Sequence, residues 1–370
     1  MKDLIDGNEA AAWGARLCRV RVVPNFPITP QTEIIEKLAE WREKGLWDGE
    51  FLPMDSEHSV LSAAIASEAA GARTFTASSS QGLLLMTEMH YVASGMRLPL
   101  VMVNCSRGLA APITLWPDNN DFLSLRDSGW LMFFAQNNQE VLDLVISAYR
   151  ISEHREVLLP SIVNMEGFIL SYTREIAEIP DQEEVDSFLP EYAPRVVLDP
   201  ERPMSLGIPS LHEYMYFRSQ VHAAQRNALR VSERVFAEFE KTFGRKYSSV
   251  EGYRTEDAGL VFVCAGALST TIKAAVNALR KEGVKAGMAR IVTFRPFPEK
   301  RLREILEGKE KIVVVDNSLS PGRGGIIHSE VSSIADCAGV VVSLGGKHIG
   351  RDDFVKIGKK VDGKGRYWYF

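Results

Sequence analysis

Three side chains in the first third of the chain have the types and positions of ligand-binding residues. Glu57 opens an Ala-rich stretch, Arg107 directly follows the apolar run Leu98–Asn104, and Thr29 lies in the turn sequence PITP. A guanidinium at the end of a buried strand can hold a carboxylate in a two-pronged geometry that Lys cannot match. Small Ala side chains let neighbouring backbones approach closely, so Glu57 is expected at the mouth of a packed, apolar environment. These three residues are therefore candidate site residues.

Each of the three also has a purely structural interpretation. A Glu in a first helical turn is stabilised by the helix dipole, which would suffice to explain Glu57. Arg107 could tie down carbonyls of its own loop, and Thr29 could be a turn residue or a helix-start cap. The unpaired histidines His58 and His90, on or beside helices, are expected to be structural. The local patterns alone leave these alternatives open.

The elements that must position these residues alternate between strand and helix. Asp55 or Ser56 can cap the buried helix that begins at Glu57. After that helix the pattern predicts a strand over Thr74–Ala77, a turn over SSSQG and a helix over Leu83–Ser94. The apolar run that precedes Arg107 is typical of a central parallel strand. The alternation indicates a three-layer α/β domain over residues 1–170.

The remaining chain divides into three predicted segments. They are a connector over 171–256, extended from Ser171 to Pro209 and helical from Leu211 to Thr242, a second and shorter α/β unit over 257–345, and a basic, glycine-bearing C-terminal arm over 346–370. The second unit repeats the strand–turn–helix rhythm, with LVFVCA and KIVVVD as its clearest strands.

Composition narrows the class of protein. The 370 residues are 45% hydrophobic and 25% charged, and carry a net charge of −5, as in ordinary globular proteins that bind no nucleic acid. No apolar run is long enough to cross a bilayer, so a soluble, cytoplasmic protein without membrane contact is expected.

GxGxxG, Walker A and GxSxG motifs are missing. The four cysteines lie far apart and form no CxxC pair, so we expect no metal site in this chain.

Several stretches, in the same order, resemble the α subunit of the 2-oxoacid:ferredoxin oxidoreductases. They are NFPITPQTEIIEKLAEW, DSEHSVLSAAIASEAAGARTFTASSSQ, SRGLAAPITLW and SLRDSGW. The resemblance covers nearly the whole chain and is greatest to the multisubunit pyruvate and 2-ketoisovalerate enzymes. It implies a pyrimidine-type, thiamine diphosphate-binding three-layer α/β domain, followed by a transketolase C-terminal-like α/β domain.

The resemblance also implies a reaction and roles for the three residues. The reaction is the oxidative decarboxylation of a 2-oxo acid, pyruvate first, which depends on thiamine diphosphate and coenzyme A and passes electrons to ferredoxin. Glu57 corresponds to the catalytic, cofactor-binding glutamate that bonds the N1′ nitrogen of the aminopyrimidine ring. Thr29 and Arg107 correspond to the family's substrate-binding residues. A branched-chain or aromatic 2-oxo acid is the alternative substrate, and a non-catalytic assembly subunit is the alternative role.

The same resemblance implies that other chains complete the enzyme. Thiamine diphosphate enzymes usually hold the pyrophosphate and Mg²⁺ through a GDG…N motif, which this sequence lacks. In the family a β subunit carries that site and a [4Fe-4S] cluster, and a δ-type subunit carries further clusters. A γ subunit is also expected, in a dimer of heteromers. The family usually reads NRALSAP where this chain has SRGLAAP, so Gly108 and Ala110 leave the identity of the substrate open.

Overall fold

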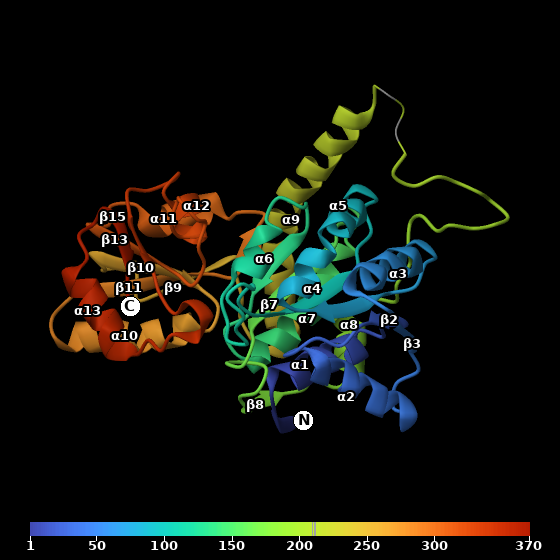
Figure 1. The fold of residues 1–370 in the computed structure, drawn as a ribbon, viewed down its shortest axis with the longest axis horizontal. Helices are drawn as coiled ribbons and strands as arrows, with labels where there is room; N and C mark the ends of the chain where they lie inside the picture. Colours follow the sequence, from blue (N-terminus) through green and yellow to red (C-terminus); the bar gives the residue numbers. More distant parts are fainter. Residues whose placement is uncertain (209, 211) are drawn as a thin grey trace.

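A computed structural model describes residues 1–208, 210 and 212–370, and shows two α/β units side by side (Figure 1). The helices are α1 Gly7–Leu17, α2 Thr32–Glu43, α3 Glu57–Ala69, α4 Ser80–Leu85, α5 Thr87–Gly95, α6 Asn120–Ser124, α7 Asn138–Ser152, α8 Gln182–Phe188, α9 Tyr214–Phe243, α10 Leu268–Lys281, α11 Glu299–Leu306, α12 Ile326–Val331 and α13 Arg351–Lys360, with a 3-10 turn at Leu344–Gly346. The strands are β1 Lys2–Ile5, β2 Val22–Asn25, β3 Glu50–Pro53, β4 Phe75–Ser78, β5 Val101–Ser106, β6 Leu131–Phe134, β7 Ser161–Glu166, β8 Glu175–Glu178, β9 Val250–Tyr253, β10 Leu260–Ala265, β11 Ala286–Ile291, β12 Thr293–Arg295, β13 Lys311–Asp316, β14 Ala338–Val341 and β15 Gly365–Trp368.

The first unit is built on a sheet with strand order β12-β6-β7-β5-β4. Strands β4 to β7 are parallel, and their residues alternate between two cores. Val101 and Val103 belong to the core that includes α1, α7 and α9, while Met102 belongs to the core that includes α3 and α5. Because both faces of the sheet are covered by helices, the predicted three-layer α/β domain is confirmed.

The carboxyl ends of β4, β5 and β7 meet at one edge of this sheet. Ser78 is paired with Asn104, and Asn104 with Asn164, in parallel register. All residues of these three strands are buried, including the polar residues Ser78, Asn104 and Asn164 near their carboxyl ends. Loops at this edge are the usual place for ligands in α/β sheets.

The second unit contains a six-stranded sheet with order β15-β14-β13-β10-β11-β9, in which only β9 is antiparallel to its neighbour among the described strands. Here the prediction of a C-terminal arm over 346–370 was wrong. Strand β15 pairs with β14 at the sheet edge, and α13 packs on the sheet through the buried residues Phe354 and Ile357. The amphipathic pattern of α13 is short, and the basic, glycine-containing composition of the segment made it difficult to recognise from the sequence.

Two other local predictions were wrong. The stretch SSSQG, expected to be a turn, already contains the first residues of α4, which begins at Ser80 with φ of +48°. The segment expected to be extended from Ser171 contains α8 and the strand β8, which pairs with β1. The predicted end of that segment at Pro209 and the predicted start of the long helix at Leu211 lie outside the described residues.

Polar contacts and one strand connect the two units. Strand β12 leaves the second unit and pairs with β6 of the first, with Thr293 opposite Phe133. The fully buried Arg290 donates to both carboxylate oxygens of Glu140 at 2.7 and 2.8 Å, and also pairs with Glu251 at 2.6 Å. The interface therefore contains a buried charge network as well as apolar side chains.

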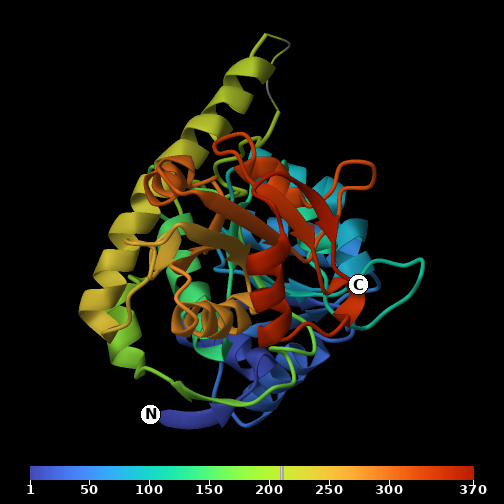
Figure 2. The same cartoon turned by 90° about the vertical axis from the view of Figure 1, so that its left-hand side faces the viewer.

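The long helix α9 packs against α7 through Val231 and Phe236, and its first turns project beyond the body of the molecule (Figures 1 and 2). Within the described part of the chain, every helix is too short or too polar to cross a membrane. All four cysteines are buried and free.

Candidate functional site

The structure brings Thr29 and Arg107 together at the carboxyl edge of the first sheet. Arg107 follows β5 directly, and its Nη1 donates to the main-chain oxygen of Thr29 at 2.7 Å. Its Nη2 donates to Oε1 of Gln81 in the first turn of α4 at 2.9 Å. Both acceptors are uncharged, so the positive charge of the guanidinium is not used up by a carboxylate contact. Burial lowers the pKa of Arg107, and the nearby Asp121 opposes that shift.

Thr29 contributes its main chain to this contact. The residue is exposed, and none of the described hydrogen bonds uses its hydroxyl group as donor or acceptor. The carbonyl fixes the guanidinium, while the hydroxyl is available to a ligand. The predicted substrate-binding role of the side chain stays a prediction.

Glu57 is the first residue of α3, where Ser56 caps the helix by accepting from the Ser59 N–H at 3.3 Å. Only 8% of Glu57 is exposed. A Cβ atom at position 82 would lie 2.6 Å from its Oε1 and 2.7 Å from Oγ of Ser78. The missing side chain of Gly82 therefore makes room for the carboxylate.

The Glu57 carboxylate makes no hydrogen bond to any described residue, although the residue is almost fully buried. Three neighbouring buried atoms are likewise without a partner, namely Ser78 Oγ, Gln81 Nε2 and Arg107 Nε. Buried polar groups in proteins are nearly always paired, so a group of unpaired ones at a sheet edge indicates a site for a polar ligand. Gln81 and Gly82 are adjacent, and they connect the Glu57 side of this site to the Arg107 side.

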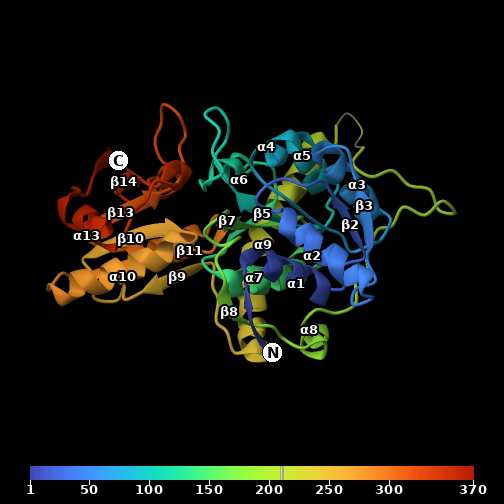
Figure 3. The ribbon, with the colours of Figure 1, turned by 60° about the horizontal axis from the view of Figure 1, so that its bottom comes forward.

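Sequence reasoning missed three residues of this arrangement: Gln81, Gly82 and Asp121. Gln81 and Gly82 fell within the predicted turn SSSQG, and Asp121 is the second residue of α6, in the stretch that follows β5. Burial raises the pKa of Asp121 to about 7, against the opposing effect of the hydrogen bonds that it accepts. The sequence offered no local signal for these contacts, because the partners of Gln81 and Asp121 lie far away in the chain. In Figure 3 the loop between β5 and α6 lies on the side of the first unit that faces the second.

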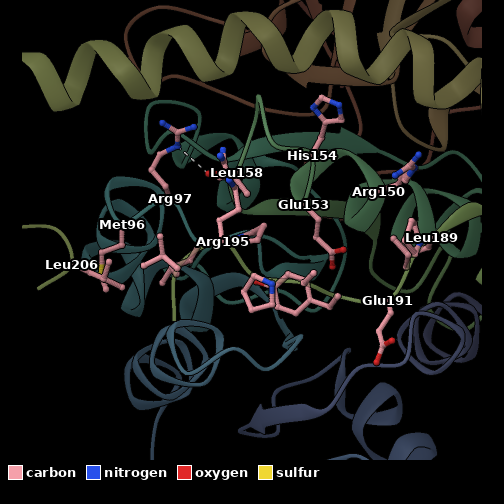
Figure 4. A pocket seen from close by; sticks show the side chains of 17 residues that line it. Met96, Arg97, Arg150, Glu153, His154, Leu158, Leu189, Glu191, Arg195 and Leu206 are labelled. Atoms are coloured by element: carbon pink, nitrogen blue, oxygen red, sulfur yellow. Dashed lines mark hydrogen bonds between the residues drawn. The ribbon is translucent and has the colours of Figure 1, made fainter. Parts of the chain in front are cut away.

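A cavity of about 280 Å³ lies elsewhere, beneath the segment that follows α8 (Figure 4). Arg97 lines it, with its guanidinium donating to the main-chain oxygens of Leu158 at 3.0 Å and Val157 at 2.6 Å. The lining contains none of the three predicted site residues. The unpaired groups at the sheet edge, rather than this cavity, therefore define the candidate site.

Comparisons with known proteins show the family of this chain. Residues 13–237 match the family model described as "Pyruvate flavodoxin/ferredoxin oxidoreductase, thiamine diP-bdg". The chain belongs to this family. Residues 258–354 of this oxidoreductase match the model described as "Pyruvate:ferredoxin oxidoreductase core domain II". The predicted family and the assignment to an oxidoreductase are confirmed.

Relatives named as pyruvate synthase subunits and relatives named as ketoisovalerate oxidoreductase subunits are about equally similar to this chain. It is 46% identical to the pyruvate synthase subunit PorA of Pyrococcus abyssi, over 90% of this chain and 85% of that protein. It is 42% identical to PorA of Methanothermobacter thermautotrophicus, over 94% and 91% of the two chains. It is also 44% identical to the ketoisovalerate oxidoreductase subunit VorA of Pyrococcus horikoshii, over 94% and 90%.

A solved structure shows the same fold. The 2-oxoglutarate:ferredoxin oxidoreductase from Magnetococcus marinus, determined with 2-oxoglutarate, coenzyme A and succinyl-CoA bound, superposes with a TM-score of 0.78. The two proteins are 18% identical over 97% of this chain and 65% of that one. At this identity the likeness concerns the fold alone.

The residues at the sheet edge fit one end of thiamine diphosphate. An aminopyrimidine ring offers hydrogen-bond donors and acceptors. The buried unpaired atoms Ser78 Oγ and Gln81 Nε2, together with the Glu57 carboxylate, to which no described residue donates, provide both kinds. Among the described residues there is no group of three or more His, Cys, Asp or Glu side chains arranged to hold a metal ion.

Proposed function

We propose that this chain is the α subunit of a pyruvate:ferredoxin oxidoreductase. The complex would decarboxylate pyruvate oxidatively, transfer the acetyl group to coenzyme A and pass the electrons to ferredoxin. The observation that carries the proposal is the unpaired carboxylate of Glu57, a residue only 8% exposed, at the same sheet edge as an Arg107 guanidinium that is held by neutral oxygens. A scaffold subunit would not need these two groups at one sheet edge.

In this proposal Glu57 holds a proton at the cofactor. Thiamine diphosphate, when bound, supplies the carbanion chemistry of the reaction. The Glu57 carboxylate binds the N1′ nitrogen of the aminopyrimidine ring and holds a proton there. Because only 8% of the residue is exposed, water competes weakly for that proton. Ser78 and Gln81 would bind the remaining polar atoms of the ring.

Arg107 and Thr29 bind the substrate. The Nε–H of Arg107 has no protein partner, and the guanidinium has no carboxylate bonded to it. A 2-oxo acid brings both a carboxylate and a carbonyl oxygen, which suit the guanidinium and the Thr29 hydroxyl respectively. Because the Thr29 carbonyl orients the guanidinium, the two residues act together.

The proposal places the other components on partner subunits. A β subunit would hold the pyrophosphate and Mg²⁺ together with a [4Fe-4S] cluster, and γ and δ subunits would complete the electron path to ferredoxin. The four cysteines of this chain are separate from one another and buried, which suits a chain without a cluster. The complex would work in the cytoplasm as a dimer of heteromers.

A branched-chain 2-oxo acid is the second candidate substrate. The relatives named VorA are as similar to this chain as those named PorA, with 44% identity in Pyrococcus horikoshii for both. Gly108 follows Arg107 directly, and a Cβ atom there would lie 2.4 Å from Cγ2 of Thr114. The loop itself therefore fills the space beside this glycine, and the similarity to the VorA proteins alone supports the second candidate.

A substrate panel tests the proposed function. The chain is co-purified with its partner subunits, and kcat/KM is measured for pyruvate, 2-oxoisovalerate and an arylglyoxylate. We expect the highest value for pyruvate and no turnover by the purified chain alone. A higher value for 2-oxoisovalerate would establish the second candidate, while turnover of no 2-oxo acid would make this chain an assembly subunit.

Arg107→Lys tests the carboxylate-binding assignment in the same complex. Lys cannot reproduce the two-pronged contact, so we expect KM for the 2-oxo acid to rise about 10-fold or more, since a charged hydrogen bond is worth about 1.5–3 kcal/mol. KM for coenzyme A should change far less. Arg97→Lys is the matched control, because Arg97 likewise donates to two neutral oxygens, here both main-chain carbonyls, but lies at the separate cavity.

A further inference from the structure

Asp121 lies at the start of α6 and is fully buried between the ends of β4 and β5. Its Oδ2 accepts from the Ser80 N–H at 2.9 Å, from the Arg107 N–H at 3.3 Å and from Nδ2 of Asn104 at 3.2 Å. Its Oδ1 accepts from the N–H of Phe122 at 2.7 Å. One carboxylate therefore binds the main chain of two different loops.

These two loops carry the two sides of the candidate site. Ser80 begins the first turn of α4, which presents Gln81 to Arg107 and Gly82 to Glu57. Arg107 begins the loop after β5. Since a single oxygen atom of Asp121 is bonded to both Ser80 and Arg107, it sets the distance between the Gln81 side and the Arg107 side.

We propose that Asp121 is a positioning residue that holds Arg107 and Gln81 in the geometry required to bind the substrate carboxylate. The inference rests on the proposed function, because it assigns Arg107 to the substrate. Asp121 is itself shielded from any ligand, with none of its surface exposed. It acts only through the loops that it joins.

The position requires a carboxylate rather than an amide. All four groups bonded to Asp121 are donors, and they approach both of its oxygens. Asn has one oxygen and one NH2 group, so in either orientation the NH2 group would face a main-chain N–H. Asp121→Asn is therefore nearly isosteric, yet it must release at least one of these bonds.

The second unit offers a matched control. Asp316 is also fully buried at the end of a parallel strand, and it accepts from the N–H groups of Ile327 and His328, each at 2.8 Å, and from Oγ of Ser318 at 2.9 Å. Asp316→Asn removes the same kind of interaction in the second unit, beside Asn317, which is bonded to Asn119 and not to Arg107, Gln81 or Glu57. Any effect common to both variants reports the loss of a buried carboxylate and not of positioning.

The experiment is a double-mutant cycle in the assembled complex, with kcat and both KM values measured for the parent, Asp121→Asn, Arg107→Lys, the double variant and Asp316→Asn. We expect Asp121→Asn to raise KM for pyruvate about 10-fold and KM for coenzyme A less than about 2-fold. In the Arg107→Lys background the same change should add less than about 2-fold, because residues that act through one another are not additive. Asp316→Asn should leave both KM values unchanged.

An unchanged KM for pyruvate in Asp121→Asn would overturn the inference, as would a rise of equal size in the parent and Arg107→Lys backgrounds. If Arg107→Lys raises KM and Asp121→Asn does not, the positioning role of Asp121 is wrong, while the proposed role of Arg107 stands. If Arg107→Lys itself has no effect, both the proposed role of Arg107 and the positioning role of Asp121 are wrong. Should Asp121→Asn not assemble, Asp121→Glu is measured by the same criteria; failure of both to assemble would show a requirement of folding and overturn the positioning role.

Discussion

The carboxyl edges of the two mostly parallel sheets contain similar buried polar groups, but these groups differ in their hydrogen-bond partners. Each contains a fully buried aspartate that accepts main-chain N–H groups, Asp121 in the first unit and Asp316 in the second. Next to Asp121, polar atoms of three residues, Ser78, Gln81 and Arg107, remain unpaired, whereas next to Asp316 the unpaired atom is Nδ1 of His328. A buried aspartate at a sheet edge therefore does not make a site by itself; the group of unpaired atoms around Asp121 does.

The end of β13 in the second unit is instead bonded to the first unit. The Asn119 N–H donates to the main-chain oxygen of Asn317 at 2.9 Å, and the side chains of these two residues are also hydrogen-bonded. The Leu319 N–H donates to Oδ1 of Asn120 at 2.7 Å. This edge is used for contact between the units. We therefore expect changes at the first edge to alter chemistry and changes at the interface to alter stability.

The largest effect is expected from Glu57→Gln. The amide has the same shape but cannot hold the N1′ proton, so decarboxylation by the assembled complex should fall by about 10²- to 10⁴-fold, the usual contribution of a positioned acid or base. Release of CO2 from pyruvate, measured per mole of assembled complex, checks this expectation. Subunit association should be unchanged, because the carboxylate makes no bond to a described residue.

Glu68→Gln is the matched control for that variant. Glu68 lies on the same helix and is also buried, but Tyr192 and the Thr74 N–H donate to its carboxylate. Its activity should stay within about 2-fold of the parent, as expected for a change outside the site. Equal losses in the two variants would contradict a special role for Glu57.

The second largest effect is expected from Arg290→Met, at the interface between the units. Removing the guanidinium leaves the buried Glu140 without its charged partner, with hydrogen bonds from Gln136 remaining, and loss of one partner of a buried pair typically costs about 3–5 kcal/mol. The thermal unfolding midpoint of the complex should fall clearly, while kcat per mole of assembled complex stays near the parent value. Arg301→Met is the control, since Arg301 and Glu304 are about half exposed and their pairing should contribute little. An unchanged unfolding midpoint together with a reduced kcat in Arg290→Met would contradict the comparison, because the interface would then affect chemistry and not stability.

The sequence predicted the parts of this molecule that depend on long, regular patterns. The apolar runs of β5, β10 and β13 and the Ala-rich helix α3 were recognised, and with them the two α/β units. The C-terminal segment was wrong because the apolar positions of α13, Phe354 and Ile357, occur in a short and strongly charged stretch.

The candidate site was predictable only in part. Glu57, Thr29 and Arg107 stand beside recognisable motifs, and the structure brings Thr29 and Arg107 into contact. That contact uses the carbonyl of Thr29 rather than the hydroxyl, which no residue type could have indicated. Gln81 and Asp121 are defined by partners far away in the sequence, so a local pattern carries no sign of them.

A smaller effect on chemistry is expected from Gly82→Ala. The added Cβ would stand 2.6 Å from Oε1 of Glu57 and 2.7 Å from Oγ of Ser78, and both are ends of side chains that can move. The carboxylate should shift while the fold remains intact, which reduces kcat by about 10- to 100-fold, since misplacement by about 1 Å has this order of cost. Gly95→Ala is the control, because a Cβ there meets no atom within 4 Å. Equal activities of the two variants would mean that the room beside Gly82 is not needed.

The smallest effect is a change in the pH dependence of stability, expected from Glu68→Gln. Burial raises the pKa of Glu68 from 4.5 to about 8. In the folded state the proton is therefore retained between these two pH values, whereas the unfolded chain releases it. The stability contributed by this group is complete below about pH 4.5 and is lost as the pH rises to about 8, by at most about 1.4 kcal/mol per pH unit.

Gln is neutral at every pH and can still accept the Thr74 N–H, so Glu68→Gln removes this loss. The thermal unfolding midpoint of the variant complex, minus that of the parent, should therefore increase from pH 5 to pH 8. A difference that is constant or decreases over this range would mean that Glu68 is already ionised in the folded protein. In that case Glu68 would carry a charge although it is hydrogen-bonded. The two buried glutamates of α3 would then differ only in that Glu57 has no hydrogen-bond partner among the described residues.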